Sequence, residues 1–206
     1  MLSAEDATEL YRCFLKDTLA LMESVAETEI MISYTPEGAE SYFDSIRTSA
    51  HRLLPQRGEG LGDRVYNALA DLLSEGFHSV AIMNADSPTL PRQYIEQAFE
   101  ELAKPGDRVV LGPTSDGGYY LIGIKRPHRR LFEDITWSSE SVLAETLERA
   151  REIALDAVLL PEWYDVDSVE EFERLKRDVL SQEDGGSRTD SNAALAANTR
   201  RFILSR

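Results

Sequence analysis

The chain has 206 residues, 42% of them hydrophobic, which is enough for one domain with a substantial core, or one domain and a tail. Its formal net charge of −15 argues against a nucleic-acid groove, because phosphate backbones are bound by clustered Lys and Arg side chains. The single cysteine, Cys13, excludes an internal disulfide framework and indicates a reducing compartment. Since we find neither a long apolar run nor an N-terminal signal, we expect a cytoplasmic protein with no membrane partner.

The first half of the chain predicts alternating helices and short strands. Ser3 opens a capping-box-like start, and an amphipathic helix follows to about residue 27. Strands are predicted over residues 30–34 and around Leu53-Leu54, with a short helix over residues 39–46 between them.

Three alternating glycines, Gly58, Gly60 and Gly62, precede a helix that is predicted over residues 63–75. A glycine-rich entry to a helix lets a ligand approach backbone N–H groups closely. No G-K-[S/T] follows, so this is not a Walker A loop. A flexible turn explains these residues as well as a phosphate site does.

A buried central strand is predicted over residues 80–83, V-A-I-M, a short apolar run with helical patterns on both sides. It is followed by Asp86 and then by Ser87-Pro88, which continue neither a strand ladder nor the interior of a helix. An acid beyond the carboxyl end of such a strand lies where open α/β sheets bind ligands. The structural alternative is a turn in which Asp86 bonds to the backbone.

The second half of the chain also predicts alternating helices and strands. Helices are predicted over residues 90–102, 140–153 and 168–181, and strands over residues 108–111, 119–124 and 155–160.

Two places in this half carry further acids. Asp116 lies in a D-G-G loop between two strands, where a hairpin turn is an equally good explanation. Asp165 and Asp167 follow the last strand and alternate, so in extended chain they point in opposite directions. One of them can therefore face a site while the other serves the structure.

The domain boundary is predicted near residue 181. Residues 1–181 form the expected domain, which the helix over residues 168–181 ends. Residues 182–206 read as a polar linker and a short C-terminal helix, because residues 182–192 offer no apolar anchor.

Four segments together resemble an uncharacterised bacterial family of glycosyltransferase-like proteins in the GT-A nucleotide-diphospho-sugar transferase superfamily. The segments are M-N-A-D-S-P-T-L-P at 83–91, L-G-P-T-S-D-G-G-Y-Y-L-I-G at 111–123, F-E-D-I-T-W-S-S at 132–139 and W-Y-D-V-D-S-V-E-E-F at 163–172. This family is similar to the guanylyltransferase that makes the deazaflavin cofactor and to molybdenum-cofactor nucleotidyltransferases. The resemblance implies a three-layer α/β/α sandwich with a mostly parallel mixed sheet.

The resemblance also implies a set of site residues. Asp86 and Asp167 match the metal-bearing acids, and Asp86 and Asp116 are the expected catalytic residues. The expected nucleotide contacts are Gln56, Gly58, Gly60, Gly62 and Asn84. A divalent cation, Mg²⁺ or Mn²⁺, is the expected cofactor, because so acidic a chain holds a nucleotide diphosphate only with a bridging cation.

The chain departs from the family pattern at its start. The pattern begins with a strand and a basic glycine-containing loop ahead of the first helix, and residues 1–3 correspond to about the end of that loop. We therefore expect the sheet to lack its usual first strand and to expose an edge beside residues 80–83. An exposed central edge invites pairing with another chain, so a homo-oligomer is among the expected partners.

Three functions follow from these expectations. The leading one is a metal-dependent transferase that acts on a nucleotide-activated sugar. The alternative is a nucleotidyltransferase that joins a nucleotide, taken from a nucleoside triphosphate, to a phosphorylated small-molecule acceptor. The third is an inactive truncated remnant with a binding role.

Overall fold

The computed structural model describes residues 3–180 and 196–206. The chain forms two compact units, and each is described by itself. The first unit is made of Met1–Ile30, Asn84–Arg92 and Tyr164–Arg206, and the second of Met31–Met83 and Gln93–Trp163. Within the described ranges, no helix combines the length and apolarity that a bilayer crossing requires.

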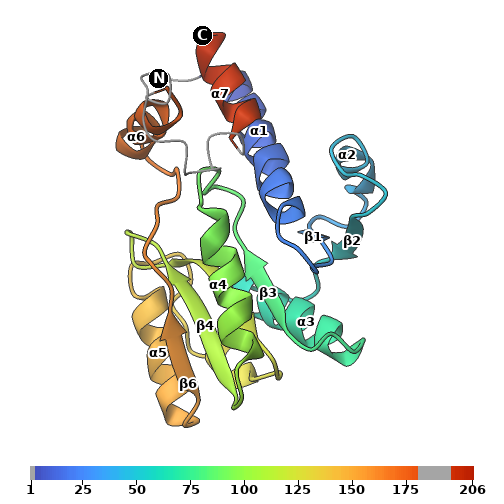
Figure 1. Ribbon diagram of the computed structural model, residues 1–206, viewed down its shortest axis with the longest axis vertical. Helices are drawn as coiled ribbons and strands as arrows, with labels where there is room; N and C mark the ends of the chain where they lie inside the picture. Colours follow the sequence, from blue (N-terminus) through green and yellow to red (C-terminus); the bar gives the residue numbers. More distant parts are fainter. Residues whose placement is uncertain (1–2, 181–195) are drawn as a thin grey trace. The chain divides into compact units, whose positions relative to one another are not determined.

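The second unit carries all the named strands (Figure 1). Its strands are β1 (Met31–Tyr34), β2 (Arg52–Pro55), β3 (Val80–Met83), β4 (Arg108–Pro113), β5 (Tyr119–Ile124) and β6 (Asp156–Leu159). Its helices are α2 (Glu40–Phe43), α3 (Leu61–Ser74), α4 (Arg92–Ala103, of which Arg92 belongs to the first unit), the 3₁₀ helix η1 (Arg129–Phe132) and α5 (Val142–Glu152).

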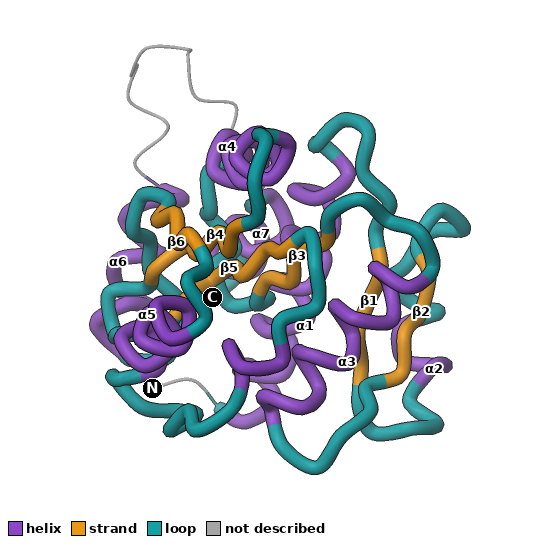
Figure 2. The backbone as a smooth tube through the Cα atoms, turned by 90° about the horizontal axis from the view of Figure 1, so that it is seen from below, coloured by secondary structure: helices purple, strands orange, loops and turns teal. Residues whose placement is uncertain are grey.

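These strands form two sheets (Figure 2). β1 and β2 are a parallel pair, with Met31 opposite Arg52. The larger sheet has the order β3-β5-β4-β6, in which β5 is antiparallel to both β3 and β4 while β6 is parallel to β4. Three of its four strands therefore run in one direction, and β5 runs in the opposite one.

The sheet is covered on both faces. Leu69 of α3 and Ala150 of α5 share one apolar core with Val80 of β3 and other strand residues, so these helices cover the same face. On the other face, a Cβ atom at Gly123 of β5 would touch Leu102 of α4, which shows how closely α4 packs there. This helix–sheet–helix arrangement is the three-layer α/β class predicted from the sequence, which is confirmed.

The first unit is helical. Its helices are α1 (Ala4–Glu23), α6 (Val169–Leu180) and α7 (Ala197–Leu204). Leu10 of α1, Leu175 of α6 and Phe202 of α7 belong to one apolar core. α7 therefore packs in the same core as α1 and α6, whereas we expected the helix over residues 168–181 to end the folded domain. The predicted linker over residues 182–192 lies outside the described residues.

A buried carboxylate fastens α7 to α1. Asp17 of α1 is 0% exposed, and it accepts hydrogen bonds from the Asn198 backbone N–H at 3.0 Å, the Asn198 side-chain amide at 2.8 Å and the Thr199 backbone N–H at 2.8 Å. These backbone groups belong to the first turn of α7, where N–H groups have no partner within the helix. The negative charge also lies at the positive end of the helix dipole.

Asp17→Ala should lower the free energy of unfolding by about 3 kcal/mol, because it leaves buried backbone donors of α7 without an acceptor. Urea unfolding and hydrogen exchange of the α7 amides would measure this. Asp6→Ala is the matched control: Asp6 of α1 forms an ion pair of 2.6 Å with Arg206, just beyond the end of α7, and its loss should cost less than about 1 kcal/mol. Equal effects of the two substitutions would contradict the role given to Asp17.

Gly117→Ala should destabilise the second unit by at least about 2 kcal/mol, because Gly117 has φ +92° and a Cβ there would overlap the backbone carbonyl of Glu140. Gly76→Ala separates the two causes, since Gly76 has φ +106° but no atom within 4 Å of a built Cβ. Gly76→Ala should lower the free energy of unfolding, measured with urea, by about 1 kcal/mol. Similar losses for both variants would show that overlap at Gly117 is unimportant.

Candidate active site

The loop that follows β3 belongs to the first unit and carries Asn84, Asp86 and Ser87. It turns sharply, because the Leu90 N–H donates to the Ser87 carbonyl at 3.0 Å and Pro88 cannot donate to a ladder. Thr18 of α1 donates its hydroxyl to the Ala85 carbonyl at 3.4 Å. The loop is thus bonded to the helical unit rather than continuing a strand.

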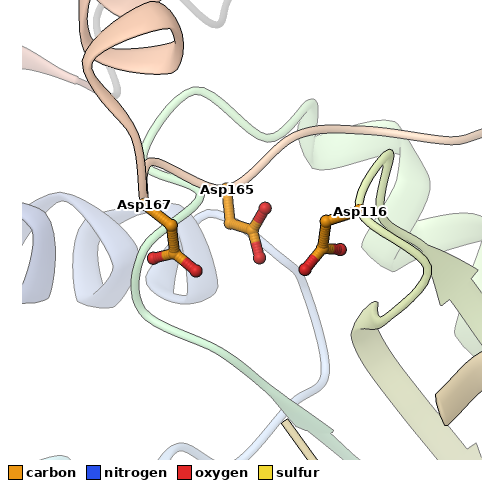
Figure 3. Close-up of side chains that lie close together, drawn as sticks. All are labelled: Asp116, Asp165 and Asp167. Carbon is orange, nitrogen blue, oxygen red and sulfur yellow. The ribbon is translucent and has the colours of Figure 1, made fainter. Parts of the chain in front are cut away.

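The segment that enters α6 lies beside this loop. The Val166 N–H donates to the Asp86 carbonyl at 3.0 Å, so the residues on either side of Val166, Asp165 and Asp167, are brought next to Asp86 in the chain's fold. A carboxylate oxygen of Asp165 and one of Asp167 lie within 4.8 Å of each other (Figure 3). In the first unit, the segment that bears the two close carboxylates is therefore bonded, through backbone groups, to the loop that bears Asp86.

The close approach of Asp165 and Asp167 differs from the sequence expectation. We expected alternating residues to point in opposite directions, which holds for a regular strand. Residues 164–167 are not in a strand, and Asp165 is 9% exposed while Asp167 is at the surface. Irregular backbone here lets both carboxylates turn the same way.

A capping box fixes the backbone at Asp167. The N–H groups of Asp167 and Ser168 donate to the Glu171 carboxylate at 3.0 and 2.8 Å, and the Glu171 N–H donates to the Ser168 hydroxyl at 3.2 Å. This is the reciprocal arrangement that S-x-x-E predicts at the start of a helix. The first turn of α6 therefore fixes the position of the Asp167 backbone.

Tyr164 anchors the other end of the segment. Its ring is fully buried, its hydroxyl donates to Asp178 of α6 at 2.6 Å, and it accepts from the Thr89 hydroxyl at 3.1 Å. The Arg174 guanidinium lies 3.8 Å from the ring centroid. Burial first, and then the bond to Asp178, raise the pKa of Tyr164, so the hydroxyl keeps its proton and remains a donor.

Two oxygens in the loop after β3 are buried without a hydrogen-bond partner among the described residues. Among the residues that the structure describes, Asn84 Oδ1 and Ser87 Oγ have no hydrogen-bond partner, and Ser87 is 2% exposed. Buried polar atoms are ordinarily bonded, and leaving one without a partner is costly. A bound ligand, ion or water would satisfy such atoms.

Asp116 belongs to the second unit, in the turn between β4 and β5 (Figure 3). Its Oδ1 accepts from the Thr114 hydroxyl at 2.5 Å and from the Gly118 N–H at 3.1 Å. The hairpin role that we considered as the alternative is therefore present. The Ser115 N–H donates to the Trp163 carbonyl at 3.1 Å, so within the second unit this turn is bonded to the segment that follows β6.

The glycine-rich loop of the second unit opens α3 as predicted. Gly58 has φ +129°, and its carbonyl accepts from Arg64 of α3 at 3.3 Å. A Cβ on Gly62 would overlap the Trp137 ring, so packing explains that glycine, whereas Gly60 has open space at the corresponding point. The Gln56 side-chain amide donates to the Ser33 carbonyl at 3.2 Å.

The predicted site residues thus fall into two groups. Asn84, Asp86 and Asp167 lie in the first unit, and Gln56, Gly58, Gly60, Gly62 and Asp116 lie in the second. Their roles stay predictions. Asp165 was not among the predicted site residues, although its place two positions before Asp167 in W-Y-D-V-D was a signal that we discounted on the alternation argument.

Solved structures share this fold. A putative nucleotide-diphospho-sugar transferase from Desulfovibrio desulfuricans G20 is 28% identical, with 98% of this chain and 86% of that chain covered and a TM-score of 0.79. A cytidylyltransferase from Leptospira borgpetersenii serovar Hardjo-bovis (strain JB197) is 13% identical, with 94% and 86% covered and a TM-score of 0.58. A 4-diphosphocytidyl-2C-methyl-D-erythritol synthase is 12% identical, with 79% and 86% covered and a TM-score of 0.56.

The last two likenesses, at such low identity, concern the fold alone. No curated protein matches the chain. The family described as "Uncharacterized protein conserved in bacteria (DUF2064)" matches residues 18–139, a span that includes the loop after β3 and the β4–β5 turn. The chain therefore belongs to this bacterial family and has the fold of nucleotide-diphospho-sugar transferases.

Proposed function

We propose that the chain is a metal-dependent transferase that acts on a nucleotide-activated sugar. The observation that carries the proposal is the approach of the Asp165 and Asp167 carboxylates, on a segment bonded to Asp86. The name of the 28% identical structure, a nucleotide-diphospho-sugar transferase, supports the same substrate class.

The donor set suits a hard divalent cation. Asp165 and Asp167 offer neighbouring carboxylate oxygens, the ligands that Mg²⁺ and Mn²⁺ prefer, and Asp86 on the adjacent loop is proposed as a further ligand. Two carboxylates within 4.8 Å of each other also repel unless a cation or a proton lies near them. When bound, the cation would neutralise charge on the diphosphate and stabilise the departing nucleotide.

The remaining residues would orient the substrate. The capping box with Glu171 and the Tyr164–Asp178 bond hold the segment that bears Asp165 and Asp167. Asn84 Oδ1 is proposed as an acceptor for a hydroxyl or amine of the nucleotide, since it has no other partner among the described residues. Asp116, with its Oδ1 used by the turn, is proposed as the acid–base group for the acceptor hydroxyl.

The glycine-rich loop is proposed as the contact to the base or ribose. Gly60 leaves the backbone open to close approach and leads directly into α3, whereas the space at Gly58 is taken by Asp63. Gln56 would turn its side-chain amide from the Ser33 carbonyl toward the nucleotide. Gly62 contributes through packing against Trp137, which fixes the start of the helix.

Nucleotidyl transfer is the second candidate, and its product distinguishes it. A glycosyl transfer releases a nucleoside diphosphate, whereas a nucleotidyl transfer from a nucleoside triphosphate releases pyrophosphate. Incubation of the protein and Mg²⁺ with nucleotide sugars or nucleoside triphosphates, in the presence of sugar and sugar-phosphate acceptors, would identify the released group. Release of neither product, together with no binding of either donor, would count against both activities.

Asp86→Asn and Asp167→Asn should each weaken magnesium-dependent binding of a nucleotide sugar at least about tenfold, because each removes a charge but keeps the shape of the side chain. Isothermal titration with a panel of uridine, guanosine and cytidine diphosphate sugars, with and without Mg²⁺, would measure this. Asp156→Asn, on the exposed β6, is the matched control and should bind like the wild type. Equal binding by wild type and Asp86→Asn would refute the assignment of Asp86.

Asp116→Asn should slow turnover at least about tenfold while it changes nucleotide-sugar binding and the urea midpoint little. The reason is that an amide oxygen can still accept the bonds from Thr114 and Gly118, but it cannot take up a proton. Steady-state kinetics and titration on the same preparation would test this. An unchanged turnover number would leave Asp116 with the turn role alone.

A further inference from the structure

One segment of the second unit, residues 133–141, has no role in the proposed function, although it packs against the turn that carries Asp116. The segment connects η1 to α5, and we call it the connecting segment. A Cβ on Gly117 would overlap the Glu140 carbonyl, which shows how closely the segment and the turn approach each other. Just beyond the segment, the Leu143 N–H donates to the Gly117 carbonyl at 2.9 Å.

Trp137, in the middle of the connecting segment, contacts the other part of the candidate site in this unit. A Cβ on Gly62, at the start of α3, would overlap its indole ring. The ring also meets the Tyr119 ring edge-on, with the two centroids 6.5 Å apart and the planes at 82°. Tyr119 is the first residue of β5, so Trp137 contacts both the glycine-rich entry to α3 and the strand that leaves the Asp116 turn.

Glu145 of α5 holds the connecting segment in place. Its carboxylate accepts from the Thr136 N–H at 2.5 Å and from the hydroxyls of Thr136 and Ser141 at 3.0 and 2.8 Å. The bond from the Thr136 N–H, and then that from Ser141, hold the pKa of the Glu145 carboxyl below its usual range, so it stays an acceptor at neutral pH. Ser138 has φ +63°, a conformation that is uncommon outside glycine and is found most often at ligand sites. The segment is thus preorganised, which lowers the cost of binding a ligand.

Trp137 offers a ring and a donor that the protein does not fully use. The residue is only partly buried. Within residues 3–180 and 196–206, its indole N–H donates no hydrogen bond. An indole combines a flat apolar surface with one N–H donor, which suits a ligand that has an apolar ring face and oxygens at its rim. A sugar ring or a cyclic polyol has both.

The connecting segment and the neighbouring turn over residues 114–118 are negatively charged. Their ionisable residues are all acidic: Asp116, Glu133, Asp134 and Glu140. The two arginines just before the segment are paired with carboxylates, Arg129 with Asp63 at 2.6 Å and Arg130 with Asp134 at 2.6 Å. A phosphate ester, with about −1.5 to −2 charge at pH 7, would therefore be repelled here, whereas an uncharged hydroxyl compound would not.

We propose that the connecting segment is the acceptor subsite of the transferase and that Trp137 determines its specificity. The acceptor is an uncharged sugar, glycoside or polyol with a free hydroxyl, and not a sugar phosphate. Its apolar face stacks on Trp137, whose indole N–H donates to one of its oxygens. This inference rests on the proposed function, because it names the acceptor of that reaction.

The transfer step balances with this acceptor and the bound donor. The acceptor hydroxyl oxygen forms a bond to the anomeric carbon of the donor sugar. The bond between that carbon and the diphosphate oxygen breaks, and its electron pair leaves with the nucleoside diphosphate. The hydroxyl proton goes to Asp116 Oδ2, the oxygen that the hydrogen bonds of the turn do not use.

Matched acceptor pairs test the charge preference. With Mg²⁺ and the nucleotide-sugar panel as donors, glucose is compared with glucose 6-phosphate, and glycerol with glycerol 3-phosphate. The uncharged member of each pair should have a kcat/KM at least about tenfold higher. Glu140→Lys puts a cation on the connecting segment and should raise kcat/KM for the phosphate esters. Glu100→Lys makes the same charge change on the exposed surface of α4 and should not.

Two substitutions test Trp137. Trp137→Leu should raise the KM for the uncharged acceptor at least about tenfold and leave the Kd of the nucleotide sugar unchanged. Trp137→Phe keeps a ring that can stack, and should raise that KM less. The urea midpoint is measured for each variant, because a loss of stability alone lowers the fraction of active protein, and hence the turnover number, but not KM.

The failure of this inference differs from the failure of the proposed function. If wild type binds a nucleotide sugar but uses the phosphate esters as well as their uncharged partners or better, the inference is overturned and the proposed function stands. An unchanged acceptor KM in Trp137→Leu would have the same meaning. If wild type binds no donor, the proposed function is overturned and this inference with it.

Discussion

The orientation of β5 is the constraint on which the second unit depends. β5 pairs with β3 on one side and β4 on the other, antiparallel to both, and β6 then follows β4 in parallel. This arrangement makes β3, β4 and β6 point the same way, so the segments after β3 and after β6 start from one edge of the sheet. If β5 ran parallel to β4, the short turn between Pro113 and Tyr119 would have to be a longer crossover connection.

The elements were predictable because each has a strong local signal. The apolar run of β3, the alternating glycines ahead of α3 and the S-x-x-E start of α6 each identified an element within a few residues of its observed bounds. The buried strands are hydrophobic enough to be recognised without knowing their partners. The sequence did not predict that these strands form two sheets, because strand pairing depends on contacts between residues that are distant in the sequence.

The sequence offered candidate acids for a site but not their geometry. Asp86 was singled out by its place after an apolar run, and Asp167 by the family resemblance. Asp165 was set aside, since the period of a strand was applied to a segment that is not one. Likewise, no local pattern predicts that Asp17, in the middle of an amphipathic helix, supplies the acceptor for the first turn of α7.

The outer edges of β1 and β3 carry no charged residue or proline, so the charge of the whole chain bears on self-association. Two chains that approach through these edges must first overcome the repulsion between net charges of −15. That repulsion is long-ranged in dilute buffer and shrinks to a range of about 8 Å at physiological ionic strength. The charge of the whole chain thus opposes, at a distance, an association that the sequences of β1 and β3 do not themselves prevent.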